Sequence, residues 1–252
     1  MRHAFRTTFP GGIVAEFVPP ARPSRKVVVL CGGFPSLPAV RTPLSLFARR
    51  GYWAFTPRYR GSWESKGKFL ARSPEEDIAI LLRAIARESF SEAWGGTTFR
   101  VSRPIFFVVG SSFGGAAAIL LARRSEVVRV AALSPVVDWK SVGKAEPLSA
   151  MERFVREGFG AAYRIAPGAW EKLRRGDFYS PAAAAREIPG EKVCILHARD
   201  DEIVPWRPVA SFARRTGSRL ALYARGGHFG LSHLGKRKRL RDRTLRFLRF
   251  GR

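Results

Sequence analysis

The chain has 252 residues, 46% of them hydrophobic, and its 45 Lys and Arg outnumber its 20 Asp and Glu to give a net charge of +25. This length suffices for one large α/β domain or two small ones. No apolar run approaches the roughly 20 residues that a membrane span needs. The basic N-terminus has no continuous apolar stretch behind it, so we expect no signal peptide and a cytoplasmic location.

The positive charge has two interpretations. It favours an anionic partner such as nucleic acid, a membrane surface or an acidic substrate, or it reflects a composition bias spread over a solvated surface. Because arginine is dispersed along most of the chain, we favour the second interpretation and predict no specific nucleic-acid partner. The exception is the segment 236–252, where nine basic residues accompany one acid, Asp242. A helix there is expected to make a weak contact with an anionic surface.

Strands and helices alternate along the chain. Two short strands around the turn 10–12 predict an antiparallel hairpin at a sheet edge. The alternation that follows favours a mostly parallel, twisted sheet of about eight strands with helices on both faces, in a single α/β domain over residues 1–252. In chain order, the expected strands are Phe5–Phe9, Ile13–Val18, Lys26–Cys31, Tyr52–Thr56, Ile105–Val109, Val127–Leu133, Val193–His197 and Leu220–Tyr223.

The clearest helix signal begins at Ser73. This serine suits an N-cap, Pro74 suits the first helical position, and Glu76 lies three residues after the cap. Apolar residues follow at spacings of 0, 3, 4 and 7 from Ile78, which predicts one face packed against a sheet. Other helices are expected at Pro43–Arg50, Gly115–Leu121, Val209–Arg214 and Leu240–Phe250.

Residues 140–190 differ from the rest, because their pattern is helical and aromatic but broken by prolines. We expect this segment to be a small helical cap or lid insertion over the carboxyl edge of the sheet, where ligands bind in such folds. Its aromatic residues either form an apolar lid or fasten the cap to the core, and we slightly favour fastening. They are Phe154, Phe159, Tyr163 and Trp170.

A serine occupies the apex of Gly110–Gly114, between the apolar run Ile105–Val109 and a helix rich in small residues. A serine hydroxyl is a poor nucleophile that needs a sharp turn to lift it clear of the sheet and small neighbours so that the helix can leave at once. The pattern therefore predicts that Ser112 is a catalytic nucleophile. The alternative, which we favour less, is an ordinary strand-to-helix turn.

A nucleophilic serine needs a base, and the base needs an acid that fixes its tautomer. With a serine turn of this type, the chain order is serine, then Asp or Glu, then His. The acid should therefore follow a strand after the serine, which makes Asp201 the first choice and Asp200 the second. The alternative interpretation of either residue is a loop carboxylate that only caps the next helix. The base is expected just beyond the last strand, in a glycine loop that holds His228, with His233 as the alternative. His3 and His197 are expected to be structural.

The tetrahedral intermediate needs two N–H donors. One is expected from Phe113, directly after the nucleophile. The other should come from the loop after Cys31, where Phe34 is favoured and Gly33 comes second.

On these residues the chain resembles the α/β-hydrolases, and more narrowly their dienelactone hydrolase and prolyl oligopeptidase-like branch. The resemblance implies a triad of Ser112, Asp201 and His228 and no cofactor. One departure is Gly32, which occupies a position where relatives often have histidine. The matching stretches are Val28–Pro35, Pro57–Gly67, the serine turn, Ser134–Trp139 and the loops around Asp201 and His228.

Several residues near the expected site are candidates for substrate contact, namely Gly33, Arg60, Trp63 and Trp139. Arg58, Arg60 and Trp63 either line the substrate pocket or belong to a structural loop whose arginines pair with Glu64 or Asp77, and the sequence leaves these two interpretations open. Cys31 and Cys194 are expected as buried thiols on different strands, without a disulfide. The scattered histidines predict no metal site.

The sequence thus favours a serine hydrolase that cleaves small carboxylic esters through an acyl-enzyme on Ser112. A small serine peptidase acting on short peptides is the alternative. A third hypothesis is a hydrolase fold reused for binding, with the basic C-terminal helix as its contact. The oligomeric state stays open.

Overall fold

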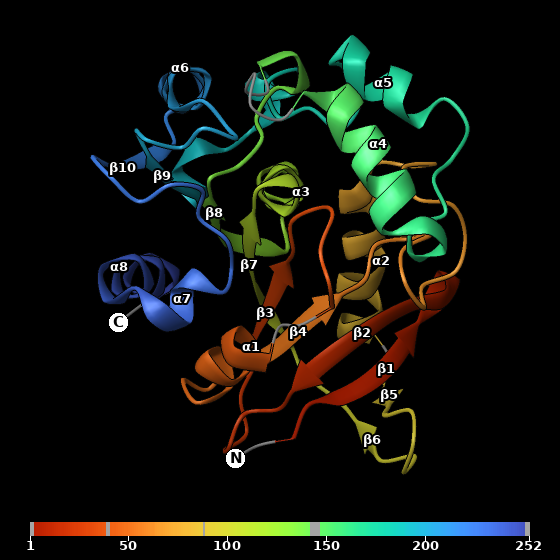
Figure 1. Ribbon diagram of the computed structural model, residues 1–252. Coiled ribbons are helices and arrows are strands. Elements are labelled where there is room, and N and C mark those ends of the chain that lie inside the picture. The colour runs from red at the N-terminus through yellow and green to blue at the C-terminus, as the bar shows by residue number, and fades with distance from the viewer. Residues whose placement is uncertain (1–2, 39–40, 88, 142–146, 250–252) are drawn as a thin grey trace.

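The computed structural model describes residues 3–38, 41–87, 89–141 and 147–249 (Figure 1). Within these residues, eight strands form one sheet in the order β1-β2-β4-β3-β7-β8-β9-β10. A separate two-stranded ribbon, β5 (Phe90–Ser91) and β6 (Thr98–Phe99), was not predicted. The bounds of the sheet strands are β1 (Phe5–Phe9), β2 (Ile13–Val18), β3 (Lys26–Cys31), β4 (Trp53–Pro57), β7 (Ile105–Ser111), β8 (Val127–Leu133), β9 (Val193–Ala198) and β10 (Arg219–Tyr223).

The strand directions confirm the mostly parallel sheet. β2 pairs antiparallel with β1 and with β4, whereas the neighbours from β4 to β10 all run parallel. The predicted hairpin therefore forms the antiparallel edge of the sheet. Parallel strands bring their carboxyl ends to one rim, and that rim is where the loops with candidate catalytic residues meet.

Helices cover both faces of the sheet, as Figure 1 shows. Successive residues of β3 face opposite ways: Val27 and Val29 pack in one core cluster, and Val28 and Leu30 pack in the other. A strand buried on both faces reads as a continuous apolar run, which is why β3 carries no polar alternation. The first cluster includes residues of α2 (Pro74–Arg87), α3 (Phe113–Leu121) and α6 (Trp206–Thr216), and the second includes residues of α1 (Arg41–Ala48), α7 (His233–Lys236) and α8 (Lys238–Leu248).

Most helix predictions differ from the structure only at the ends. Helix α2 begins at Pro74 as predicted, but the Ser73 hydroxyl donates to the Glu75 carboxylate instead of completing the expected box with Glu76. Helix α6 starts three residues before the predicted Val209, because Pro205 is its N-cap and Pro208 fits its first turn. None of the described helices is long and apolar enough to span a bilayer.

The segment between β8 and β9 contains α4 (Leu148–Gly158) and α5 (Ala169–Arg175) within the predicted cap, and residues 142–146 lie outside the described ranges. Tyr163 and Trp170 are buried at the base of this segment. The Tyr163 hydroxyl donates to Ser36 O at 3.1 Å, and the Trp170 ring lies 6.0 Å from that of Phe34. These two aromatic residues fasten the segment to the core, which is the interpretation that the sequence analysis favoured. That the segment acts as a lid stays a prediction.

The close packing of the turn around Ser112 can be tested at Gly114. A Cβ on Gly114 would overlap the carbonyl oxygens of Cys31 and Gly32, which are backbone atoms and cannot move aside alone. We expect Gly114→Ala to lower the free energy of unfolding by about 3 kcal/mol or more. Urea denaturation followed by circular dichroism measures this change.

The matched control is Gly158→Ala in α4, where the nearest atom to the new Cβ is a Phe154 ring carbon at 3.4 Å. That variant should change stability by less than about 1 kcal/mol. Equal destabilisation of the two variants would contradict the close packing of the turn.

Candidate active site

Ser112 occupies a strained turn between β7 and α3. Its φ of +53° and ψ of −120° are rare for a residue with a Cβ. Its N–H donates to Leu133 O at 2.9 Å, and its carbonyl accepts from Val136 N at 3.1 Å, so the end of β8 holds the turn from both sides. Glycines at 110 and 114 allow the close backbone approach. This geometry is that of a nucleophile elbow.

His228 and Asp201 meet in a hydrogen-bonded pair. His228 Nδ1 lies 2.9 Å from Asp201 Oδ2 and 3.1 Å from Oδ1. The Asp201 side chain has no exposed surface, and Oδ1 also accepts from Ile203 N and Val204 N at 3.1 and 3.0 Å. The pair leaves the other ring nitrogen of His228 available, on a side chain that is 20% exposed.

The Asp201 carboxylate is ionised despite its burial. Burial alone would raise its pKa, but the hydrogen bond and charge of His228, with hydrogen bonds from Val204 and Ser134, lower the pKa below its ordinary value. An ionised carboxylate fixes the Nδ1–H tautomer of the imidazole and would stabilise an imidazolium.

Asp200, the second choice for the acid, has a different place. Its carboxylate accepts from Gly226 N at 3.0 Å and from Gly227 N at 2.8 Å. These hydrogen bonds lower the pKa of Asp200 and clamp the loop immediately before His228. The two adjacent aspartates thus make different contacts. Asp201 binds the imidazole of His228, and Asp200 binds the backbone of the loop that carries it.

Ser134 was missed as a site residue. It has a φ of +42° and is fully buried at the end of β8. Its hydroxyl accepts from Phe229 N at 2.9 Å and also bonds the Asp201 carboxylate, so it joins the acid to the residue after the base. The sequence signals were a Ser-Pro pair closing a strand, which is common in strand-ending turns, and its place in the matching stretch Ser134–Trp139, which assigned it no role.

The expected oxyanion donors lie beside the elbow. A Cβ on Gly33 would lie 3.6 Å from Ser112 Cβ, and the rings of Phe34 and Phe113 lie 5.2 Å apart. Phe113 is the first residue of α3, so its N–H has no acceptor within the helix. Within the described ranges, neither Phe34 N nor Phe113 N donates to a backbone carbonyl.

A cavity of about 50 Å³ opens next to this loop. Gly33 and Trp63, two of the predicted substrate contacts, line it together with Ser36, Tyr59 and Tyr163. The Trp63 indole N–H donates to Ser36 O at 3.1 Å, which fixes the ring in the cavity wall.

The arginines of this region are engaged elsewhere. Arg60 pairs with Asp77 at 3.0 Å, and Arg58 pairs with Glu64 at 2.6 Å and with Glu16 at 2.7 Å. Both arginines therefore form the structural ion pairs that the sequence left open, although Arg58 also lines the cavity with Trp63.

The remaining candidates lie in supporting positions, where Trp139 and His197 are buried and His233 is half-buried. Trp139 is 3% exposed, donates to Tyr179 O at 2.8 Å and packs against Phe113, which favours support of the oxyanion residue over substrate contact. His233 Nδ1 accepts from Gly230 N at 2.9 Å. His197 is fully buried with Nε2 2.9 Å from Val204 O, the structural role expected for it.

The two cysteines are free and buried, as predicted. Among the described side chains, no group of three or more His, Cys, Asp or Glu is placed to hold a metal ion.

Comparison with known proteins gives no matching family model and no matching curated sequence. Solved structures do match. The Pyrococcus furiosus esterase Pf2001 has a TM-score of 0.68 at 16% identity, over 98% of this chain and 90% of its own. A serine hydrolase homologue from Coxiella burnetii has a TM-score of 0.58 at 18% identity, over 98% of this chain and 97% of its own.

The Pyrococcus horikoshii acylaminoacyl peptidase also matches, with a TM-score of 0.65 at 16% identity. The match covers 98% of this chain but 41% of the peptidase, so this chain corresponds to less than half of that protein. Similarities at these identities establish the architecture, and the chain has the α/β-hydrolase fold predicted from its sequence.

Proposed function

We propose that this protein is a serine hydrolase of small carboxylic esters, with Ser112 as nucleophile, His228 as general base and Asp201 as the acid that orients it. The observation that carries the proposal is the His228–Asp201 pair at 2.9 Å on a loop tied to the same strand end as the serine elbow. Ser134 Oγ accepts from Phe229 N on the His228 loop, and its neighbour Leu133 O accepts from Ser112 N in the serine turn. The esterase, the serine hydrolase homologue and the peptidase that share the fold add support.

The proposed reaction proceeds by acyl transfer. Ser112 Oγ attacks the ester carbon while His228 Nε2 takes the hydroxyl proton, and Asp201 stabilises the imidazolium. The tetrahedral intermediate collapses, the C–O bond to the alcohol breaks, and His228 returns the proton to the leaving oxygen. Water then attacks the acyl-enzyme with His228 as base again, which releases the acid and restores the Ser112 hydroxyl.

The proposed oxyanion site consists of the N–H groups of Phe34 and Phe113. Both groups are fixed before substrate arrives, because Phe113 begins α3 and the Phe34 ring is held among those of Phe69, Phe113 and Tyr163. Fixed donors stabilise developing charge without reorganising, and each typically contributes ~100- to 1,000-fold to turnover.

A small neutral ester fits the site better than a peptide. The cavity beside Gly33 is about 50 Å³, room for a short acyl group. A peptide needs anchors for its backbone or termini. Arg58, which lines the cavity, and Arg60, which lies next to it in sequence, already pair with carboxylates and are not free to anchor a peptide. The peptidase therefore stays the second candidate, and a cytoplasmic location stays part of the proposal.

The substrate class is tested with p-nitrophenyl esters of increasing acyl length and aminoacyl p-nitroanilides. We expect turnover of acetyl and butyryl esters, a fall in kcat/KM for long chains, and little amide cleavage. Ser112→Ala should lower kcat by about 10⁶-fold, because the nucleophile and base act as a unit. Steady-state kinetics on the purified protein measure both effects.

Comparable rates on esters and anilides would establish the peptidase alternative instead. Ester turnover that survives in Ser112→Ala would remove Ser112 from the mechanism, and Ser111→Ala is the matched control for disturbance of the turn.

Asp200 gives a second test of the same site. Removing its carboxylate in Asp200→Ala frees two backbone N–H groups of the loop that carries His228. A small displacement of a catalytic group costs up to about 100-fold. We expect kcat to fall about 10- to 100-fold with KM nearly unchanged, because the loop positions the base and does not bind substrate.

Glu202→Ala, which removes an exposed acid two positions further on, is the control and should leave kcat unchanged. Asp200→Asn keeps one acceptor oxygen and should be intermediate. If Asp200→Ala raised KM and left kcat intact, the positioning role would be wrong.

A further inference from the structure

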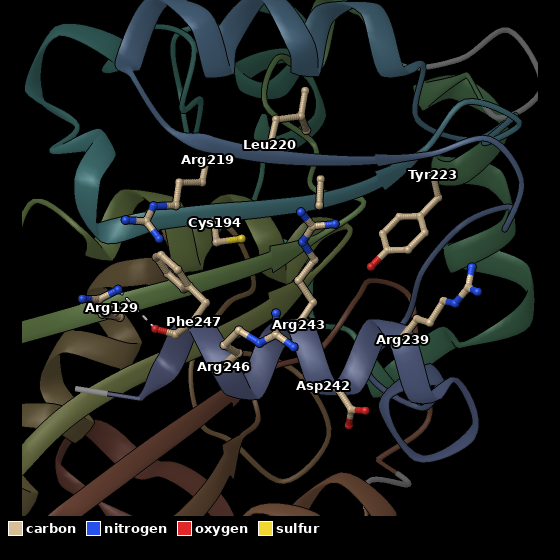
Figure 2. Close-up of a pocket in the computed structure, with 11 residues that line it drawn as sticks. Arg129, Cys194, Arg219, Leu220, Tyr223, Arg239, Asp242, Arg243, Arg246 and Phe247 are labelled. Carbon is tan, nitrogen blue, oxygen red and sulfur yellow. Dashed lines mark hydrogen bonds between the residues drawn. The ribbon is translucent and has the colours of Figure 1, made fainter. Parts of the chain in front are cut away.

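A second cavity lies between the edge strand β10 and helix α8, apart from the residues proposed for catalysis. It has a volume of about 690 Å³, within the range of small-molecule sites. Five of the residues that line it are arginines and one is an acid (Figure 2). The arginines are Arg129, Arg219, Arg239, Arg243 and Arg246.

The alternation of side chains along β10 and the helical spacing along α8 place most of these arginines on facing walls of the cavity. Residues 219, 221 and 223 alternate onto one face of β10, beside Cys194 of β9. On α8, positions 239, 243 and 246 follow helical spacing along one face. Figure 2 shows Arg219 and Tyr223 on the strand wall and Arg243 reaching from the helix toward the strands. The cations thus converge from two walls into a groove.

The arginines that line this groove have no carboxylate partner among the described residues. Among the described residues, none of the five guanidiniums forms an ion pair with a carboxylate, whereas Arg58 and Arg60 elsewhere are paired. The one acid, Asp242, pairs instead with Arg241 at 3.4 Å and points away from the strands in Figure 2. Like charges on one helix face destabilise the helix, so the arrangement favours a bound anion.

Two of the arginines are held in place without an anion. The Arg129 guanidinium donates to Phe247 O at 3.3 Å and lies 5.0 Å from the centre of the Phe247 ring. That of Arg219 lies 5.5 Å from the same ring. Stacking on an aromatic ring orients a guanidinium and leaves its N–H edge free to donate.

The buried thiol on the floor of the groove is affected by this charge. Burial raises the pKa of Cys194 to about 11, and the charges of Arg243 and Arg219 oppose that rise. The positive potential therefore extends to the floor of the groove between the two walls.

We propose that this groove binds a small anion with two or more phosphate groups, of the inorganic polyphosphate or nucleoside polyphosphate class. The planar guanidinium fork matches phosphate oxygens in pairs, and several phosphates are needed to engage cations from both walls. A concave groove between a strand and a helix suits a small ligand, whereas a nucleic acid or a membrane requires an extended or flat cationic surface.

Isothermal titration calorimetry of the full chain with inorganic tripolyphosphate at low ionic strength tests the proposal. Arg219→Gln/Arg243→Gln removes one guanidinium from each wall. Arg83→Gln/Arg153→Gln removes the same charge from exposed positions on α2 and α4 and is the control. We expect the groove variant to bind about 100-fold more weakly than the wild type, and the control to bind within about twofold.

Binding should also raise the melting temperature of the wild type and the control, but not that of the groove variant. An absence of tripolyphosphate binding, or an equal loss in both double variants, overturns the proposal. Inorganic phosphate that binds as tightly as tripolyphosphate overturns the requirement for several phosphates. Short single-stranded RNA or phosphatidylserine vesicles that bind through Arg219 and Arg243 when tripolyphosphate does not would assign the groove to a macromolecular partner instead.

Discussion

The site depends on one buried carboxylate. Asp201 has no exposed surface, and an ionised carboxylate in such a place is stable only when hydrogen bonds surround it. The structure supplies them from His228, from Ile203 and Val204, and from Ser134. Satisfying this carboxylate therefore fixes three loops, which follow β8, β9 and β10, at one rim of the sheet.

Strain and close packing support that rim from below. Positive φ angles at Ser112 and Ser134 persist only because the strands and helices around them leave no alternative. The two residues lie at the ends of neighbouring parallel strands, and Ser112 N–H donates to the carbonyl just before Ser134. The proposed nucleophile and the support of the proposed base are thus parts of one rigid unit, although the serine hydroxyl makes no hydrogen bond among the described residues.

Much of this was predictable from the sequence, because it follows from periodicity and turn chemistry. Continuous apolar runs gave the parallel strands, and small residues around Ser112 gave the elbow. The roles of Asp200 and Ser134 were not predictable, since each depends on backbone N–H groups brought close only by the fold. The sequence singled out the basic segment 236–252 but treated the other arginines as a composition bias, and the groove became visible only when residues of β8, β10 and α8 were placed together.

Reaction with a fluorophosphonate tests the central claim most directly, because it requires a serine activated by its neighbours and no knowledge of the natural substrate. Mass spectrometry of the wild type should show a single adduct that peptide mapping places on Ser112. Asp201→Asn should react about 10⁴-fold more slowly, since the imidazole loses its correct tautomer. A wild type that stays unlabelled, or an adduct on another residue, would contradict the account.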